Sequence, residues 1–328
     1  MKKTVVFLTL VALVLAFVHI YTENTHQEKT LYLMDTVINI NINGNKADME
    51  ALCDILKKYD KMLNVHDENS EIYKINQGQN EMSEDIAEIL LKGYELCALT
   101  EGAFDYTLKP LSDLWGISDG RTSIPQKTDI KNALLKTGYQ KIRIDENNID
   151  LNGTQLDLGG IAKGYVTEKL ISEIKNRNIK KAVIDLGGNI YVLDSKKDVR
   201  VGIQKPFSPR GEALLTVDVN DTSVISSGTY ERFFEKDGKV YHHIFDAKTG
   251  YPADNKISSV TIIGEPLKAD VLSTALLVMD IEKATKLYEE QKDFEFIIVK
   301  ENKVYVTEKI AEKITLLDDT YKIVKAGK

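Results

Sequence analysis

Apolar residues alternate with polar ones in some parts of the chain and recur every three or four positions in others. Alternation through residues 30–44 predicts a strand that turns at Gly44. The longer period predicts helices over residues 46–62 and 83–99, the second with Ser83 as its N-cap. Further helices are expected near residues 129–136, from the 159–164 glycine turn to about Asn176, and over residues 267–279 and 281–291.

Strand patterns are concentrated between residues 181 and 264, and a last pair of short strands follows the final helix. The stretch "ERFFEKDGKVYHHIF" predicts a hairpin that turns at Asp237-Gly238. "LDLGGIAKGYVTEKL", residues 156–170, has the pattern of a strand that ends on two glycines and continues as a helix. Its first five letters are echoed by "IDLGG" at 184–188, either as a duplicated unit or as reuse of a favourable turn.

No linker rich in Pro, Gly or Ser follows residue 30. The pattern therefore favours one continuous α+β domain over residues 30–328, with a mixed or antiparallel sheet and packed helices. A formal charge of −7 argues against a nucleic-acid partner, because phosphate backbones require clustered Lys and Arg. Cys53 and Cys97 lie in apolar helical patterns without metal-ligand spacing, which predicts buried free thiols and no zinc site.

The first 22 residues differ from the rest of the chain. Lys2 and Lys3 precede an apolar run that carries no charge until Glu23, the pattern of a signal peptide or signal anchor. The two lysines are expected to stay in the cytoplasm. After a polar spacer, residues 23–29, the domain is then expected to work outside the cytoplasm, either anchored to the cell membrane or released by cleavage.

The glycine turn at residues 159–164 does not follow a known nucleotide-binding pattern. Its only lysine, Lys163, precedes a glycine, so it is not a Walker A loop, and the dinucleotide fingerprint is absent. Glycines and a helix N-terminus still offer free N–H groups and a partial positive charge to an anion. Asp157 would repel a phosphate unless it holds a sugar hydroxyl, a ring N–H or a cation. A phosphate site and a plain packing turn both remain open.

A second group of polar residues lies on the helix over residues 267–279. Asp270 and Thr274 are four positions apart and share one face, with Ser273 beside them. A carboxylate with hydroxyls and no nitrogen or sulfur suits Mg²⁺, which completes its shell with water and substrate phosphate. The alternative is a buried aspartate whose charge is satisfied by neighbouring hydroxyl and N–H groups.

His242 and His243 end a predicted strand, where neighbouring side chains point to opposite faces. They cannot chelate one ion together, but one of them could act as a proton acceptor near neutral pH. His66 and the lone Trp115 are ambiguous, because each could stack on a planar ligand or simply pack.

Several stretches in a fixed order resemble the ApbE family of flavin transferases, the FAD:protein FMN transferases. They are "MDTVINI", "NSEIYKIN", "GAFDYTLKPLSDLWG", "DLGGIAKGYVTEKL", "DLGGNIYV", "SSGTYERFF", "HHIFDAKTG" and "ADVLSTALLVM". The resemblance implies an α+β fold that binds FAD with Mg²⁺, moves FMN onto a Thr or Ser hydroxyl of a partner protein and releases AMP. Partners in the family are flavin-carrying subunits of membrane redox complexes and secreted FMN-binding domains.

The resemblance also implies roles for single residues. Those at family FAD contacts are Met34, His66, Ala103, Phe104, Asp105, Asp157, Lys163 and Phe245, and those at the metal site are Gly160 through its carbonyl, Asp270, Ser273 and Thr274. His243 matches the suspected general base, and Lys163 would neutralise phosphate charge. Asp35 stands where Gly is commoner, and His66 stands where many members have Tyr. The resemblance implies that this second position influences whether FMN is transferred to protein or FAD is hydrolysed. An FAD pyrophosphatase and a non-catalytic exported FAD-binding protein are the alternatives.

Overall fold

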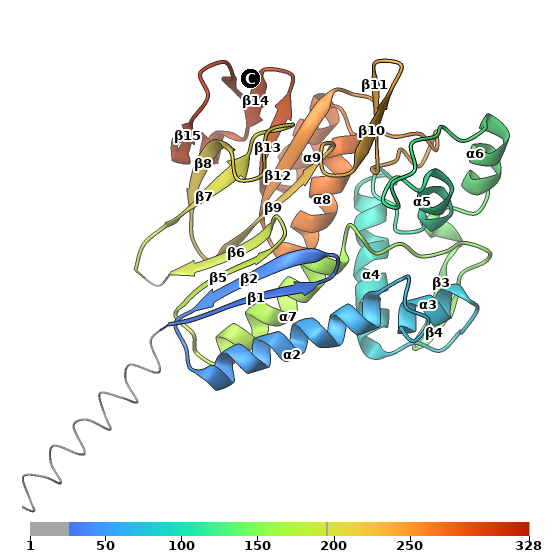
Figure 1. The fold of residues 1–328 in the computed structure, drawn as a ribbon, viewed down its shortest axis with the longest axis horizontal. Helices are drawn as coiled ribbons and strands as arrows, with labels where there is room; N and C mark the ends of the chain where they lie inside the picture. Colours follow the sequence, from blue (N-terminus) through green and yellow to red (C-terminus); the bar gives the residue numbers. More distant parts are fainter. Residues whose placement is uncertain (1–25, 195, 328) are drawn as a thin grey trace, which may run out of the picture.

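The computed structural model describes residues 26–194 and 196–327, so the predicted export segment lies outside the described residues. Within them, one long sheet runs through the molecule (Figure 1). Its neighbours are antiparallel except for the last pair, β14 and β16, which is parallel. In spatial order the strands are β1 (Gln27–Leu33), β2 (Thr36–Ile42), β5 (Lys181–Leu186), β6 (Asn189–Asp194), β9 (Thr222–Gly228), β12 (Ile257–Gly264), β13 (Glu295–Lys300), β14 (Lys303–Val306) and β16 (Lys322–Lys325).

Helices cover one face of this sheet and a smaller sheet covers the other (Figure 1). Neighbouring residues of one strand serve the two layers, because side chains alternate across a strand: Ile225 packs in the core beneath the helices, and Val224 packs against the smaller sheet. The principal helices are α2 (Lys46–Leu63), α4 (Glu84–Leu99), α7 (Ala162–Asn176), α8 (Pro266–Val278) and α9 (Ile281–Gln291); the smaller sheet contains β7 (Val199–Gln204), β8 (Ala213–Val219) and β15 (Ile314–Leu316).

A peripheral unit packs around Trp115, which is fully buried. It is built from α5 (Lys109–Trp115), α6 (Lys127–Leu134) and the hairpin of β10 (Phe233–Lys236) with β11 (Lys239–His242). The predicted turn at Asp237-Gly238 is confirmed, with φ of 53° and 73°. The remaining elements are α3 (Glu71–Asn76), β3 (Arg143–Asp145), β4 (Asn148–Asp150) and two 3₁₀ helices, η1 (Tyr139–Lys141) and η2 (Glu308–Lys313).

Local sequence signals explain where the main helices begin. Asn45 and Asp48 form a reciprocal capping box at the start of α2, and the Ser83 hydroxyl accepts the Ile86 N–H at the start of α4. The predicted helices at α2, α4, α6, α7, α8 and α9 are confirmed within a few residues at their ends. Cys53 and Cys97 are buried free thiols, as predicted. Among residues 26–194 and 196–327, no helix has the length and apolar character needed to cross a membrane.

Two strand predictions are wrong. Residues 30–44 do not form a single strand: the chain reverses between β1 and β2 at Met34 and Asp35, whose φ values are 53° and 56°. Residues 156–160 form no strand either, because side-chain and loop groups bind their backbone instead of a neighbouring strand. The last helix is followed by β13, β14, β15 and β16 rather than by one short pair.

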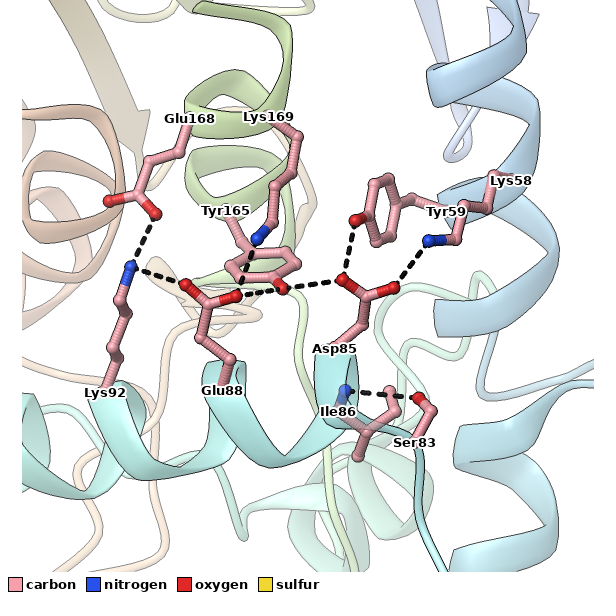
Figure 2. Close-up of polar contacts among 10 residues, drawn as sticks. All are labelled: Lys58, Tyr59, Ser83, Asp85, Ile86, Glu88, Lys92, Tyr165, Glu168 and Lys169. Carbon is pink, nitrogen blue, oxygen red and sulfur yellow. Dashed lines mark hydrogen bonds and ion pairs between the residues drawn. The ribbon is translucent and has the colours of Figure 1, made fainter. Parts of the chain in front are cut away.

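A helix junction of eight polar side chains joins α2, α4 and α7 (Figure 2). Asp85 and Glu88 lie on α4 between the other two helices, and Tyr165 donates to both carboxylates at 3.2 and 2.8 Å. Lys58, Tyr59, Lys92 and Lys169 complete the bonding of these two acids, and Lys92 also bonds Glu168 at 2.9 Å. Every charged group of the helix junction therefore has a direct partner of opposite charge.

Candidate active site

Residues 156–160 form an extended segment that leads into α7, and one side-chain amide holds its beginning. Asn76, at the end of α3, donates to the Leu156 carbonyl at 2.9 Å and accepts the Leu156 N–H at 2.7 Å. The Asp157 N–H donates to the Tyr106 carbonyl at 2.8 Å. These bonds satisfy the backbone as a neighbouring strand would, and so they fix the position of the bend at Gly159 and Gly160.

The bend lies directly against α8. A Cβ atom on Gly160 would lie 3.2 Å from the Thr274 hydroxyl oxygen and 3.0 Å from a ring carbon of Phe104. One turn further along α7, a Cβ on Gly164 would lie 2.7 Å from the Cβ of Asp270. Such separations leave no room for a side chain, so glycine is needed at Gly164 for the two helices to come this close. The diglycine bend and the acid-and-hydroxyl face of α8 therefore lie side by side.

Asp270 is a buried carboxylate with incomplete compensation. Its side chain is 3% exposed, and its Oδ2 accepts the Gly164 N–H at 2.8 Å. Within the described residues, this is the only hydrogen bond of the carboxylate, which has no ion pair. Burial raises the pKa of Asp270, and the nearby Lys163 charge and the Gly164 N–H oppose that rise without cancelling it. A cation at this carboxylate would supply the missing charge.

The two polar side chains that follow Asp270 on α8, Ser273 and Thr274, offer only oxygen atoms. The Ser273 hydroxyl donates to the Asp270 main-chain carbonyl at 2.8 Å and lies 2.7 Å from the Ser227 hydroxyl on β9. Thr274, half-buried, presents its hydroxyl towards Gly160. The described part of the chain has no cluster of three or more His, Cys, Asp or Glu side chains able to hold a metal. One carboxylate with neutral oxygens fits a hard cation that keeps other ligands, and the roles of Gly160, Asp270, Ser273 and Thr274 as ligands stay a prediction.

Lys163 is half-buried in the first turn of α7. Its positive charge acts on the pKa of both Asp270 and His243. Lys163 forms no salt bridge with any residue that the structure describes. A cationic group without a fixed partner at the start of a helix suits an anionic ligand.

The two histidines differ in their surroundings, as the strand pattern predicts. His242 is buried: its Nδ1 accepts the Ile244 N–H at 3.3 Å, which leaves Nε2 to donate to the Ala253 carbonyl at 2.9 Å. Both ring nitrogens of His242 are therefore used by the fold. His243 is half-buried, and its Nδ1 lies 3.2 Å from the Arg232 carbonyl.

That single bond leaves the second nitrogen of His243 available. Because the Arg232 carbonyl can only accept, Nδ1 carries the proton and Nε2 is the free acceptor in the neutral ring. Burial, together with the positive charge of Arg232, lowers the pKa of His243 to about 4. The ring is therefore neutral at physiological pH and able to accept a proton, which makes His243 the stronger candidate base of the pair.

The loop before α5 contributes the aromatic ring of Phe104 and the buried carboxyl group of Asp105. Phe104 lies against Gly160. Asp105 accepts the N–H and hydroxyl of Thr107 at 2.8 and 2.6 Å through Oδ1, and the Tyr139 N–H at 3.1 Å through Oδ2. Burial raises the pKa of Asp105, and these bonds oppose the rise. In this structure Asp105 thus holds the loop in shape, and any contact with FAD would be additional.

The other predicted FAD contacts are spread over separate elements. Met34 turns between β1 and β2, and its N–H donates to Asp60 on α2 at 2.6 Å. His66 is exposed in the loop after α2, Ala103 is half-buried, and Phe245 is buried with its ring 5.9 Å from Trp115. Asp157 accepts the Ser112 hydroxyl from α5 at 2.8 Å.

Trp115 is a packing residue. It is fully buried, and its Nε1 donates to the Gly250 carbonyl at 2.9 Å. Of the two readings that its sequence context leaves open, packing is therefore the one that the structure supports. Two surface hollows, one around Lys205 and Asp318 and one around Lys181 and Asp218, contain none of the candidate site residues.

Comparison with known proteins identifies the arrangement. The model of the ApbE family matches residues 34–298, which include every candidate site residue. The chain belongs to the ApbE family. It is 31% identical over 280 residues to the FAD:protein FMN transferase of Klebsiella pneumoniae, covering 82% of this chain and 88% of that protein. It is 30% identical over 298 residues to that of Treponema pallidum, covering 83% and 82%.

Solved structures show the same ApbE fold. The crystal structure of the ApbE protein from Thermotoga maritima superimposes with a TM-score of 0.80 at 30% identity, over 88% of this chain and 99% of that one. The mixed sheet with packed helices is therefore the architecture of the ApbE family.

Sequence reasoning missed several residues that position the ApbE site. They are Asn76, Ser112, Ser227 and Arg232. Each acts through a contact with a residue at least 11 positions away, and although all four lie within the stretches that resemble the ApbE family, their residue types alone do not indicate these contacts. Only Asn76 carries a signal of its own, because an amide offers the donor and the acceptor that an unpaired backbone segment requires.

Proposed function

We propose that the chain is an FAD:protein FMN transferase that uses Mg²⁺ to move FMN from FAD onto a Thr or Ser hydroxyl of a flavoprotein and releases AMP. Family membership over residues 34–298 and relatives that carry this name support the reaction class. The acceptor would be an extracytoplasmic flavoprotein, such as a subunit of a membrane redox complex or a secreted FMN-binding domain. That part of the proposal rests on the charge and apolar pattern of residues 1–22, which lie outside the described residues.

One observation carries the proposal: the diglycine bend lies against the α8 face that contains Asp270 and Thr274. A buried, under-compensated carboxylate next to hydroxyl oxygens fits Mg²⁺, which would be held by Asp270, Thr274, Ser273 and the Gly160 carbonyl. When bound, Mg²⁺ supplies charge neutralisation to pyrophosphate oxygens and stabilises a phosphate leaving group.

The chain's own residues would do the rest. Lys163 at the start of α7 offers a positive charge to the phosphates. The neutral His243 ring would accept the proton of the incoming hydroxyl at Nε2, while the Arg232 carbonyl fixes the orientation of the ring through Nδ1. The oxygen of that hydroxyl would then bond to the phosphorus of the FMN half as the bond to AMP breaks. Such a reaction depends mainly on placement and charge.

A direct assay tests the proposal. The full-length chain in detergent is incubated with FAD, Mg²⁺ and soluble FMN-binding domains of candidate redox-complex subunits, and intact-mass spectrometry records the acceptor. A covalent FMN adduct with an equal amount of AMP, both lost in EDTA, is the expected result. AMP with free FMN and no adduct would instead identify a pyrophosphatase, and FAD binding without AMP would identify a binding protein.

A further inference from the structure

An aromatic surface lies beside the candidate base, formed by Phe207, Tyr230 and Phe233. The Phe207 ring packs edge-on against both neighbours, with centroids 5.8 Å from Tyr230 and 5.6 Å from Phe233. Phe207 remains 54% exposed and Phe233 39% exposed. Aromatic rings that cluster yet stay open to solvent are typical of places where another protein binds.

The backbone conformation of Phe207 is energetically unfavourable, and the packing of its side chain does not account for it. Its φ is 59°, in the left-handed region that Gly and Asn tolerate far better than an aromatic residue. Because about half of Phe207 is exposed, burial of its side chain offsets little of this unfavourable backbone energy. A ring kept at this position therefore indicates a use outside the stability of the chain.

The aromatic surface is continuous with the active site through the segment 230–233. Tyr230 and Phe233 flank Arg232, whose carbonyl accepts the main-chain N–H of His243 and holds its ring nitrogen. On the other side, the Tyr230 ring covers Gly228, the neighbour of Ser227, which bonds Ser273 on α8. The same short segment thus holds the candidate base and carries two of the three rings.

An ion pair links the two chain segments that carry the three rings. Arg210 bonds Glu231 at 3.1 Å, which ties the loop of Phe207 to the segment 230–233. Arg210 and Glu231 are thus paired with one another, and the remaining charge of the segment, that of Arg232, bonds the Ser118 hydroxyl at 3.3 Å. An apolar side chain on a partner fits such a surface better than a charged one does.

We infer that the aromatic surface docks the acceptor protein, by binding an apolar side chain near the hydroxyl that receives FMN. The inference rests on the proposed function, because that function requires a foreign hydroxyl to reach His243. Docking at Phe207 and Phe233 would bring the acceptor to the segment that holds the base, so binding would be coupled to placement of the hydroxyl.

Another exposed aromatic residue provides a matched control. Tyr32 on β1 is 71% exposed and pairs with the exposed Val37 of β2, at the edge of the long sheet. If any large exposed aromatic ring could dock the acceptor, Tyr32 would be the better site, because it has the largest exposed fraction of the three residues. The docking inference instead requires the effect to be specific to Phe207 and Phe233.

The test compares Phe207→Asn, Phe233→Ser and Tyr32→Ser in the full-length chain, with an acceptor domain that the wild-type chain flavinylates. Phe207→Asn and Phe233→Ser should each raise the KM for the acceptor by about tenfold, the size typical of an aromatic interface anchor. FAD affinity should not change, and the melting temperature of Phe207→Asn should equal or exceed that of the wild type. Phe207→Tyr, which keeps the ring, and Tyr32→Ser should leave the KM unchanged.

The possible failures are distinguishable. If the wild-type chain transfers no FMN to any acceptor, the proposed function fails, and this inference fails with it. If wild-type transfer occurs but Phe207→Asn and Phe233→Ser match it, or if Tyr32→Ser is equally impaired, only the docking inference is overturned. A change of oligomeric mass by light scattering in Phe207→Asn would show that the surface binds a second copy of the chain, which also overturns it.

Discussion

The helix junction and the active site contain the same kinds of ionisable group, but only one of them pairs its charges. At the helix junction, burial would raise the pKa of Glu88, yet hydrogen bonds from Lys169, Lys92 and Tyr165 outweigh it and lower the pKa to about 2. In the active site, burial prevails at Asp270 and raises its pKa. A carboxylate with direct hydrogen-bond and ion-pair partners therefore has a structural role. A carboxylate without such partners is available to bind a ligand.

The two regions are neighbours on one helix. α7 carries Tyr165 and Lys169 to the helix junction and Lys163 and Gly164 to the active site. The firmly bonded side of α7 thus supports the side where charges are left unpaired. This comparison leads to four predictions, in order of decreasing effect.

Replacing Asp270 should have the largest effect. We expect Asp270→Asn to reduce Mg²⁺-dependent AMP release from FAD by about a thousandfold, because the charge that holds the cation is removed. Without Mg²⁺, the melting temperature should not fall, because an uncompensated buried charge is lost. The gain in melting temperature that Mg²⁺ gives the wild-type chain should disappear.

The exposed Asp119 provides the control, and Asp119→Asn should behave as the wild type in both assays. If Asp270→Asn kept both turnover and thermal stabilisation by Mg²⁺, Asp270 would belong with the structural acids of the helix junction.

Replacing His243 should affect transfer more than binding. We expect His243→Ala to keep its affinity for FAD and to lose between about a hundredfold and ten-thousandfold in transfer rate, the range for a general base. Because the pKa of His243 is about 4, the transfer rate of the wild-type chain should stay level down to about pH 5 and fall only below it.

His242 is the matched control, because it differs by one position and is used by the fold. His242→Ala should lower the melting temperature instead of acting selectively on transfer. An acid limb near pH 6.5 in the wild-type profile would contradict the assignment of His243.

Glu168 is the exception within the helix junction. Burial, with the Glu265 carboxylate next to it, raises its pKa from 4.5 to about 7, against the opposing pull of Lys92. The folded chain therefore keeps this proton to a higher pH than the unfolded chain does. Raising the pH from 4.5 to 7 should lower the contribution of Glu168 to the free energy of unfolding by about 3 kcal/mol, with no further loss above pH 7, whereas the lowered pKa of His243 raises stability over part of the same range.

Denaturant unfolding at pH 5 and pH 8 measures the slope of stability with pH. Glu168→Gln should make this slope more positive than in the wild type, and Glu173→Gln on the same helix should leave it unchanged. The groups that face Glu168 are Lys92 from α4 and Glu265 at the start of α8. An unchanged slope in Glu168→Gln would assign the pH dependence to another group.

The smallest effect is expected at Glu88. Glu88→Gln should lower the free energy of unfolding by about 1 kcal/mol, because the carboxylate is part of a partly exposed network. The transfer rate should not change. Glu95→Gln, exposed on the same helix, is the control for denaturant unfolding. A large loss of transfer in Glu88→Gln would mean that the helix junction does more than support α7.

Much of the fold could be predicted from local patterns. The helices with clear caps, such as those after Asn45 and Ser83, lie where the periodicity places them, and the turn at Asp237-Gly238 forms as its residue types require. The hairpin at Met34 and Asp35 could not be predicted in this way, because Asp tolerates a left-handed conformation but Met rarely adopts one. Its conformation depends on contacts such as the bond from Met34 to Asp60 on α2.

The candidate site was predictable in part. The shared helical face of Asp270 and Thr274 follows from a spacing of four, and their contact with the diglycine bend agrees with the idea of a joint site. The use of Asp105 within its own loop could not be foreseen, because its partner Tyr139 is 34 positions away. The same holds for Arg232, which orients His243 through a carbonyl that every residue type possesses.

The amide of Asn76 has a consequence for the divergence of such chains. It replaces a whole strand edge at Leu156, using one donor and one acceptor separated from that residue by 80 positions. Because both bonded groups at Leu156 are main-chain atoms, which every residue except proline provides, this pairing constrains the residue type at position 76 but not at position 156. A relative could therefore vary at position 156 without loosening the bend, whereas loss of the amide at position 76 would leave a buried donor and a buried acceptor unpaired.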